Sequence, residues 1–328
     1  MAGNKQYLSN DRKQGVDVTV KGGEELIANE KTAFAGVEST PKPESAPLRF
    51  AQCPCCTSVR MKPFYINPAP SPIINWQQFF FGSRKFIHSI YRCCDCGYRF
   101  INNLTADAEK YYCQQEAGHY INKSIYRQRY FRELKNRLEK QRGFVPLSGF
   151  SMLDLGCADG EWLLLWQKNA DLFGTEISPE FCTVLKKRGI KIVSPPFDRR
   201  FDVITMFDYL EHVPDPLAEL HAMSRLLNKG GYLILSVPDM GKIIAKLLGI
   251  RYYLFCPMHF SYFDRQSLGK LLDRAYPQGE AVLFRSPAMK FDLKMLFNWL
   301  RISHLLPRSA NLPMPIGYSA SLVAMVRF

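Results

Sequence analysis

One stretch decides the fold of this chain: Phe150-Ser-Met-Leu-Asp-Leu-Gly-Cys-Ala-Asp-Gly160. Its apolar centre, Met152 to Leu155, is typical of a buried parallel strand. Gly156 and Gly160 free the backbone for a tight turn, and a helix is predicted to begin at Trp162. The stretch therefore predicts a strand, a glycine turn and a helix, which together begin an α/β sheet.

A second apolar strand, Leu172-Phe-Gly-Thr-Glu176, ends in an acid twenty positions after Gly156. An acid at this place accepts hydrogen bonds from a ribose diol, so the pair of strands predicts a nucleoside pocket. A dinucleotide needs bare amides around its pyrophosphate, whereas Asp154 and Asp159 flank this turn and Ala158 replaces a glycine. Two carboxylates favour a ligand with an ammonium and a sulfonium and no phosphate, which describes S-adenosylmethionine.

Four blocks of sequence follow one another along the chain: Leu153–Gly160, Phe201–Pro216, Leu226–Asp239 and His259–Leu272. Together they resemble the class I S-adenosylmethionine-dependent methyltransferases, in the branch that includes ubiquinone-type O-methyltransferases. The resemblance implies an α/β fold with a seven-stranded, doubly wound, Rossmann-like sheet. We expect its strands near residues 151–155, 172–176, 190–194, 202–206, 231–237, 281–285 and 319–327.

The resemblance also implies which residues bind S-adenosylmethionine. Those expected around the methionine moiety are Asp154, Gly156, Cys157, Ala158, Gly160, Phe207, Asp208 and, closing over it, Tyr112 or Tyr111. Glu176 is expected at the ribose and Ile177 at one face of the adenine. The family usually places an acid after the third strand, but Ile192–Phe197 contains none, so backbone groups near Ser194 are expected to replace it.

His212 and His259 are the predicted catalytic bases, because histidine titrates near neutral pH and both lie in loops that resemble the substrate side. In ubiquinone-type relatives a set like Asp208, Glu211 and His212 binds a divalent ion. The structural alternative is a Glu-His pair that opens a helix, with His212 capping or packing only.

Ten cysteines in an intracellular chain indicate metal binding or free thiols before disulfides. Two pairs with two-residue spacers, Cys53/Cys56 and Cys93/Cys96, predict a structural, tetrahedral Zn²⁺ site in a zinc-ribbon-like module. Cys55 and Cys94 each offer an alternative ligand one position away, and a redox pair is the other interpretation. The module is similar to one found ahead of sugar C-methyltransferase domains and of methyltransferases in polysaccharide gene clusters.

The 328 residues are predicted to form a disordered leader at 1–48, a zinc-binding module at 49–103, a helical linker or lid at 104–149 and a methyltransferase domain at 150–328, with a lid insertion at about 289–316. The net charge of +13 is concentrated in residues 83–142, which carry thirteen basic and six acidic side chains. This surplus indicates a phosphate-bearing partner or, alternatively, the solvated face of an amphipathic helix.

These features predict a cytoplasmic enzyme, because neither a signal peptide nor a run of about 20 apolar residues is found. The expected reaction is methyl transfer to a small-molecule or glycan-precursor acceptor, most simply at oxygen. RNA is the second choice of acceptor, and a non-catalytic zinc-bearing adaptor is the third interpretation. An aromatic helix expected at Leu293–Leu306 allows peripheral membrane contact.

Overall fold

The computed structural model describes residues 50–66, 89–102, 124–141, 144, 148–249, 252, 254–255, 259–292, 313–318 and 321–328. The side chains of 124–126, 244, 248, 289–292 and 313–318 are not described. Several predictions therefore lie outside the described residues: the leader 1–48, the lid residues Tyr111 and Tyr112, and the helix at 293–306.

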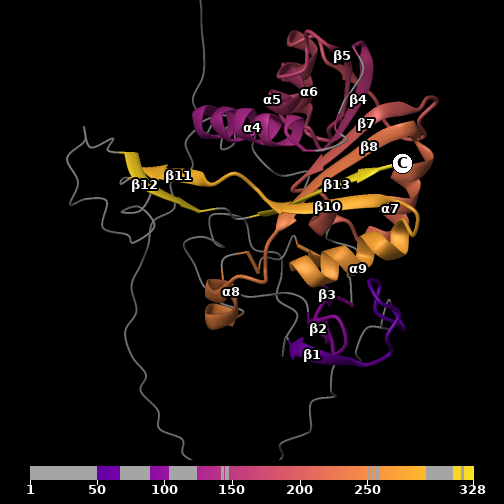
Figure 1. Ribbon diagram of the computed structural model, residues 1–328, viewed down its shortest axis with the longest axis vertical. Coiled ribbons are helices and arrows are strands. Elements are labelled where there is room, and N and C mark those ends of the chain that lie inside the picture. The colour runs from indigo at the N-terminus through magenta and orange to yellow at the C-terminus, as the bar shows by residue number, and fades with distance from the viewer. Residues whose placement is uncertain are drawn as a thin grey trace, which may run out of the picture. The chain divides into compact units, whose positions relative to one another are not determined.

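A seven-stranded sheet forms the centre of the chain, with strand order β10-β13-β8-β7-β4-β5-β6 (Figure 1). The strands are β4 Phe150–Leu155, β5 Ala170–Thr175, β6 Lys191–Ile192, β7 Phe201–Phe207, β8 Leu227–Pro238, β10 Glu280–Arg285 and β13 Ser321–Arg327. Strands β4 to β8 are parallel, whereas β13 is antiparallel to both of its neighbours, β8 and β10. The predicted Rossmann-like sheet is thus confirmed, with each strand near its expected position.

Successive residues of the central strands pack on opposite faces of this sheet. Met152 packs with the helix α4 (Ser124–Glu139), whereas its neighbour Leu153 packs with the opposite core, which holds α7 (Pro216–Arg225) and α9 (Arg265–Ala275). Burial on both faces explains why the strands are almost continuously apolar. The remaining helices are α5 Glu161–Leu164, α6 Pro179–Lys187, the 3₁₀ turn η1 Leu210–His212 and α8 Ile243–Leu248.

Helix α4 has the amphipathic character that the sequence indicates. Leu134 and Leu138 are fully buried and Phe131 nearly so, and they pack against Trp162 and Trp166. Helix α5 is shorter than expected. After Leu164 the backbone continues in 3₁₀-type turns, in which the amides of residues 165, 166 and 169 donate to the carbonyl oxygens three positions earlier. Strand β5 then begins at residue 170.

The cysteine-rich module forms its own four-stranded sheet, ordered β1-β2-β3-β9. Strands β1 Met61–Tyr65, β2 Ile90–Cys93 and β3 Arg99–Ile101 come from the module, whereas β9 Ser261–Tyr262 comes from the segment before α9. This strand was not expected, because two residues carry no readable alternation. In the insertion near 289–316, β11 Met289–Asp292 pairs with β12 Pro313–Tyr318.

Candidate active site and metal centre

The glycine turn after β4 has the backbone conformation that its sequence requires. Gly156, Ala158 and Gly160 have φ angles of 66°, 49° and 77°, all in the left-handed region that favours glycine. At Gly160 an added Cβ would also meet the side chains of Leu185 and Ile190 at under 3 Å. The turn can therefore keep its shape only with a residue that lacks a side chain at this position.

Glu176 lies at the carboxyl end of β5 and faces this turn. One of its oxygens accepts from the Ala158 amide at 2.9 Å, and the other accepts from the amides of Ile177 and Ser178, both at 2.8 Å. These three bonds fix the carboxylate beside the β4 turn. The oxygen that accepts from Ala158 keeps a further lone pair, so the group can still accept from a ribose hydroxyl.

The two carboxylates that flank the turn are not equivalent, which corrects the electrostatic argument from sequence. Asp159 is paired with Arg127 at 3.2 Å and with Arg188 at 3.6 Å, so its charge is already balanced. Asp154 is 4% exposed and accepts from the Thr205 hydroxyl at 2.6 Å. Burial raises the pKa of Asp154 to about 7. Asp154 is thus the carboxyl whose charge a bound cation can stabilise.

The other predicted cofactor residues surround the same end of the sheet. Ile177 is 66% exposed just beyond β5, in keeping with a surface that an adenine ring could cover. Cys157 is buried against Gly174 of β5. Phe207 ends β7 and packs on Trp162 with ring centroids 4.9 Å apart. Asp208 follows it at a φ of 49° and accepts from the Ser236 hydroxyl at 3.0 Å.

The predicted bases His212 and His259 are brought together although they are 47 positions apart in the sequence. Their ring centroids lie 4.7 Å apart at an interplanar angle of 71°. Glu211 joins them: one ligand atom from each of the three side chains lies within 4.8 Å of the others. The ubiquinone-type pattern implies Asp208 as the third member of this group, whereas the structure places His259 there.

Burial determines the protonation of this Glu-His-His cluster. Glu211 is 1% exposed, and among the described residues neither of its oxygens has a hydrogen-bond partner. Desolvation raises the pKa of Glu211 well above its usual range. Desolvation also lowers the pKa of His212 well below its usual range and that of His259 to about 4. Both imidazoles are therefore neutral at pH 7, the form in which histidine can accept a proton, but the lowered pKa makes each of them a weaker base than a solvated histidine.

The low pKa of His259 predicts a pH-dependent stability. An unfolded histidine titrates near 6.5, so between about pH 6.5 and 4 the unfolded chain binds the extra proton and stability falls as the pH falls. Over this window His259 should cost about 3 kcal/mol of unfolding free energy. The raised pKa of Glu211 has the opposite effect, because its protonation favours the folded state as the pH falls. The contribution of His259 is therefore measured as the difference in the pH dependence of denaturant unfolding between His259→Gln and the unchanged protein. The exposed His221→Gln is the control, and an equal pH slope in all three would contradict the prediction.

The four predicted metal-ligating thiols converge in the cysteine-rich module. The sulfurs of Cys53 and Cys96 lie 3.6 Å apart, those of Cys56 and Cys93 lie 3.5 Å apart, and all four are within 4.8 Å of one another. Tetrahedral Zn²⁺ with bonds of about 2.3 Å needs sulfurs about 3.8 Å apart, so the set fits this ion. Hydrogen bonds from the neighbouring thiols of Cys55 and Cys96 lower the pKa of Cys53 to about 5, which favours a thiolate ligand.

Two further cysteines lie beside this set without joining it. Cys55 is buried near Cys53, whereas Cys94 is exposed on the second knuckle. Among these cysteines, the four that lie close enough together to hold an ion are Cys53, Cys56, Cys93 and Cys96, the set indicated by the two-residue spacers. All eight cysteines in the described part of the chain are free thiols.

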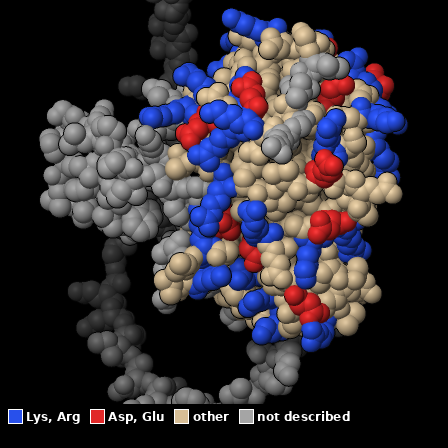
Figure 2. Space-filling model, in the orientation of Figure 1, with Lys and Arg blue, Asp and Glu red and all other residues tan. Residues whose placement is uncertain are grey.

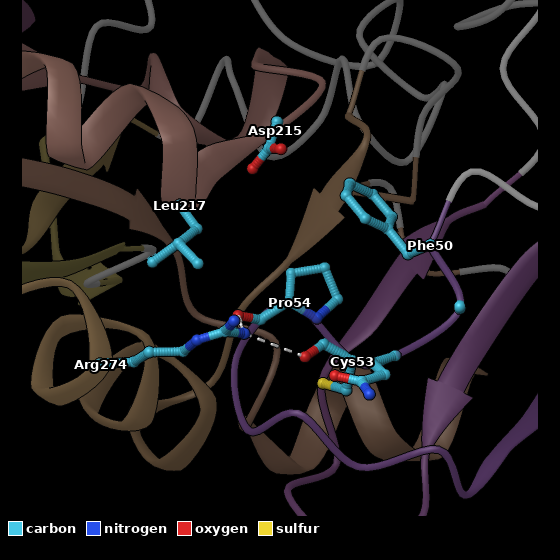
Figure 3. A pocket seen from close by; sticks show the side chains of 8 residues that line it. Phe50, Cys53, Pro54, Asp215, Leu217 and Arg274 are labelled. Atoms are coloured by element: carbon cyan, nitrogen blue, oxygen red, sulfur yellow. Dashed lines mark hydrogen bonds between the residues drawn. The ribbon is translucent and has the colours of Figure 1, made fainter.

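A cavity of about 330 Å³ marks the junction between the module and the sheet domain (Figure 3). From α9, Arg274 donates to the carbonyl oxygens of Pro54 at 2.7 Å and Cys53 at 3.4 Å. Asp215, which caps α7, and Leu217 line the cavity from the side of the sheet domain. The first cysteine knuckle is thus hydrogen-bonded to a helix of the central domain.

The comparisons with known proteins agree with this geometry. Residues 124–275 match a family described as a methyltransferase domain. These residues therefore form a methyltransferase domain, and they are similar to the class I S-adenosylmethionine-dependent methyltransferases. The assignment covers the turn, both histidines and the helices of the central sheet.

The curated relatives include ubiquinone biosynthesis O-methyltransferases. One from Paracidovorax citrulli is 26% identical over 129 residues, 34% of this chain and 54% of the relative. Another, from Xanthomonas oryzae pv. oryzae, is 33% identical over 117 residues, 30% of this chain and 48% of the relative. The chain thus spans about half the length of these relatives. A solved methyltransferase from Thermotoga maritima is 18% identical, with a TM-score of 0.43 over 64% of this chain and 94% of its own.

Sequence reasoning missed several residues that shape the site of this methyltransferase domain. Thr205 bonds Asp154 from the next strand, and Arg127 and Arg188 balance Asp159 from α4 and from the end of α6. The sequence holds a signal for Arg127, because it lies on the face of α4 that leads to Phe131 and Leu134. Thr205 sits inside an apolar strand, where a buried hydroxyl indicates a polar neighbour across the ladder.

Proposed function

We propose that the protein transfers a methyl group from S-adenosylmethionine to an oxygen of a small-molecule or glycan-precursor acceptor. The observation that carries the proposal is the methyltransferase-domain match over residues 124–275, which contain the glycine turn, Asp154 and Glu176. Relatives named as O-methyltransferases support oxygen as the acceptor atom. The eight free thiols in the described residues are in keeping with the cytoplasm as the site of action.

In this proposal Asp154 and the glycine turn hold the methionine part of the cofactor, and Glu176 holds its ribose. The bound molecule supplies an electrophilic methyl carbon on a sulfonium. A cationic ligand beside Asp154 would favour its ionised form, so cofactor binding should release a proton below pH 7. Positioning of donor and acceptor then supplies most of the rate enhancement.

His212 and His259 are the proposed bases. As the acceptor oxygen forms its bond to the methyl carbon and the carbon–sulfur bond breaks, the hydroxyl proton passes to a neutral imidazole. Glu211 lies 3.9 Å from the Nε2 atom of His212, and a positive charge on that imidazole would favour the ionised form of the Glu211 carboxyl, which would then stabilise the imidazolium. The same three side chains could hold a divalent ion, which would lower the pKa of the acceptor hydroxyl.

We further propose that Cys53, Cys56, Cys93 and Cys96 hold a structural zinc ion. Four thiolates complete a tetrahedral shell and leave no position open for a substrate. A module of about 50 residues gains stability from such an ion, because its own hydrophobic core is small.

Calorimetric titration with S-adenosylhomocysteine tests the proposal. We expect one binding site per chain with a dissociation constant between about 1 μM and 1 mM, the span in which most enzymes have their KM values. Heat exchanged in buffers of different ionisation enthalpy at pH 6 should reveal the proton released near Asp154. Absence of binding at millimolar ligand would leave the non-catalytic adaptor as the better reading.

RNA remains the second acceptor, because basic side chains are concentrated in and around α4. Figure 2 shows Lys and Arg interspersed with Asp and Glu on the face in view. Several basic groups already have acidic partners on the same helix or nearby, among them Arg127, Lys135 and Arg137. RNA binding whose affinity falls steeply with salt would favour this alternative.

Membrane contact through residues 293–306 stays a prediction, since they lie outside the described residues. Among the described helices, none combines the length and apolarity needed to cross a bilayer.

A further inference from the structure

The cysteine-rich module and the histidine pair are joined by one continuous run of backbone hydrogen bonds. Strand β3 of the module pairs with β9, so Phe100 lies opposite Ser261 and Arg99 lies opposite Tyr262. Strand β9 begins two residues after His259. The edge of the module's sheet is thus completed by the segment that carries one of the two proposed bases.

Phe260 connects this shared sheet to the second base. Its carbonyl accepts from the amide of Ile101 at 2.9 Å, at the end of β3. Its amide donates to the carbonyl of Glu211 at 2.7 Å, within the 3₁₀ turn that also holds His212. A shift of β3 would therefore displace Phe260 and, through it, the two segments that carry His212 and His259.

A buried side-chain hydrogen bond fixes the same junction. The hydroxyls of Tyr98 and Ser261 lie 2.6 Å apart, and both residues are at most 2% exposed. Tyr98 is two positions from the metal-ligating Cys96, and its carbonyl accepts from the amide of Cys93 at 2.8 Å. Its ring stacks on Phe263 with centroids 5.2 Å apart. One side chain thus connects the second cysteine knuckle directly to β9.

We infer that the cysteine-rich module is a positioning element for the His212–His259 pair, acting through the buried hydrogen bond between Tyr98 and Ser261. The inference rests on the proposed function, in which this pair accepts the proton of the acceptor. Tyr98 and Ser261 are positioning residues, since they act on the strand that follows His259. The module would thus be required for the geometry of proton transfer and would have no part in holding the cofactor.

The test uses the full-length, zinc-loaded protein and the variants Tyr98→Phe and Ser261→Ala, each of which removes one hydroxyl. Loosening β9 should admit water to His259 and raise its NMR titration midpoint by about half a pH unit. Zinc content and the affinity for S-adenosylhomocysteine should stay within about twofold of the unchanged protein, because neither ligand set is altered. Ser261→Thr keeps a hydroxyl and should restore the original midpoint.

Tyr276→Phe is the matched control. The Tyr276 hydroxyl is also buried and bonds the Leu220 carbonyl at 2.6 Å, but it lies between α7 and α9, away from the histidines. It should lower stability by about as much as Tyr98→Phe and leave the His259 midpoint unchanged. An unmoved midpoint in Tyr98→Phe, or an equal shift in Tyr276→Phe, overturns the inference. Failure of the proposed function appears separately, as absent S-adenosylhomocysteine binding in the unchanged protein.

Discussion

Replacing Asp154 with alanine is expected to weaken S-adenosylhomocysteine binding by about a hundredfold or more and to leave zinc content unchanged. Asp154 is the unpaired carboxyl at the turn, since Asp159 is occupied by Arg127 and Arg188. Its charge is available to the ammonium of the ligand and is poorly solvated without it. Calorimetric titration at pH 8, where the carboxyl is ionised, measures the effect directly.

The same substitution should not destabilise the unliganded protein at pH 8. Burial raises the pKa of Asp154 to about 7, so stability is lost as the pH rises from the unfolded value near 4 towards 7. Alanine removes this cost, although it leaves the Thr205 hydroxyl with only the more distant Leu153 carbonyl, at 3.4 Å. We expect an unchanged or higher midpoint of denaturant unfolding.

Asp202→Ala is the matched control at the opposite end of the sheet. Asp202 accepts from the amide and hydroxyl of Ser151, both at 2.8 Å, and from Asn228 at 2.7 Å. Its loss should reduce stability by about 1 to 3 kcal/mol and preserve S-adenosylhomocysteine affinity. If Asp154→Ala keeps its affinity, or if Asp202→Ala loses it, the placement of the cofactor is wrong.

The fold could be predicted from sequence because its strands are apolar on both faces and are separated by clear turn signals. Gly156 and Gly160 adopt the positive φ angles that the motif requires, and Glu176 lies beside Ala158 as the acid-tipped strand indicates. These features depend on local conformation and on parallel strands ending at one edge, and both are encoded within about thirty residues.

The electrostatics and the long-range contacts could not be predicted in the same way. The charge of Asp159 is balanced by Arg127, 32 positions away, and the pairing of β3 with β9 joins residues more than 160 positions apart. Neither contact leaves a periodic signal in the sequence. Each of the two histidines, His212 and His259, is predicted separately from the loop in which it lies. The distance of 4.7 Å between their ring centroids depends on how the chain packs around Phe260.

Replacing Cys96 with serine is expected to remove the bound zinc and to loosen the module, with elemental analysis showing a loss of about one zinc per chain. The Cys96 sulfur is buried and belongs to the same core as Tyr98, Phe100 and Phe263. Loss of the ion should therefore lower the stability of the shared sheet as well. Binding of S-adenosylhomocysteine should persist, because Asp154 and the glycine turn lie in the central domain.

Two neighbouring cysteines provide the controls for the zinc assignment. Cys94→Ser alters an exposed thiol outside the four-sulfur set and should retain one zinc per chain with unchanged stability. Cys55→Ser places a hydroxyl in a buried position beside Cys53 and should retain zinc at some cost in stability. Zinc retained in Cys96→Ser would contradict the assignment. Zinc lost in Cys55→Ser or in Cys94→Ser would show that this cysteine replaces its neighbour, Cys56 or Cys93, as a ligand.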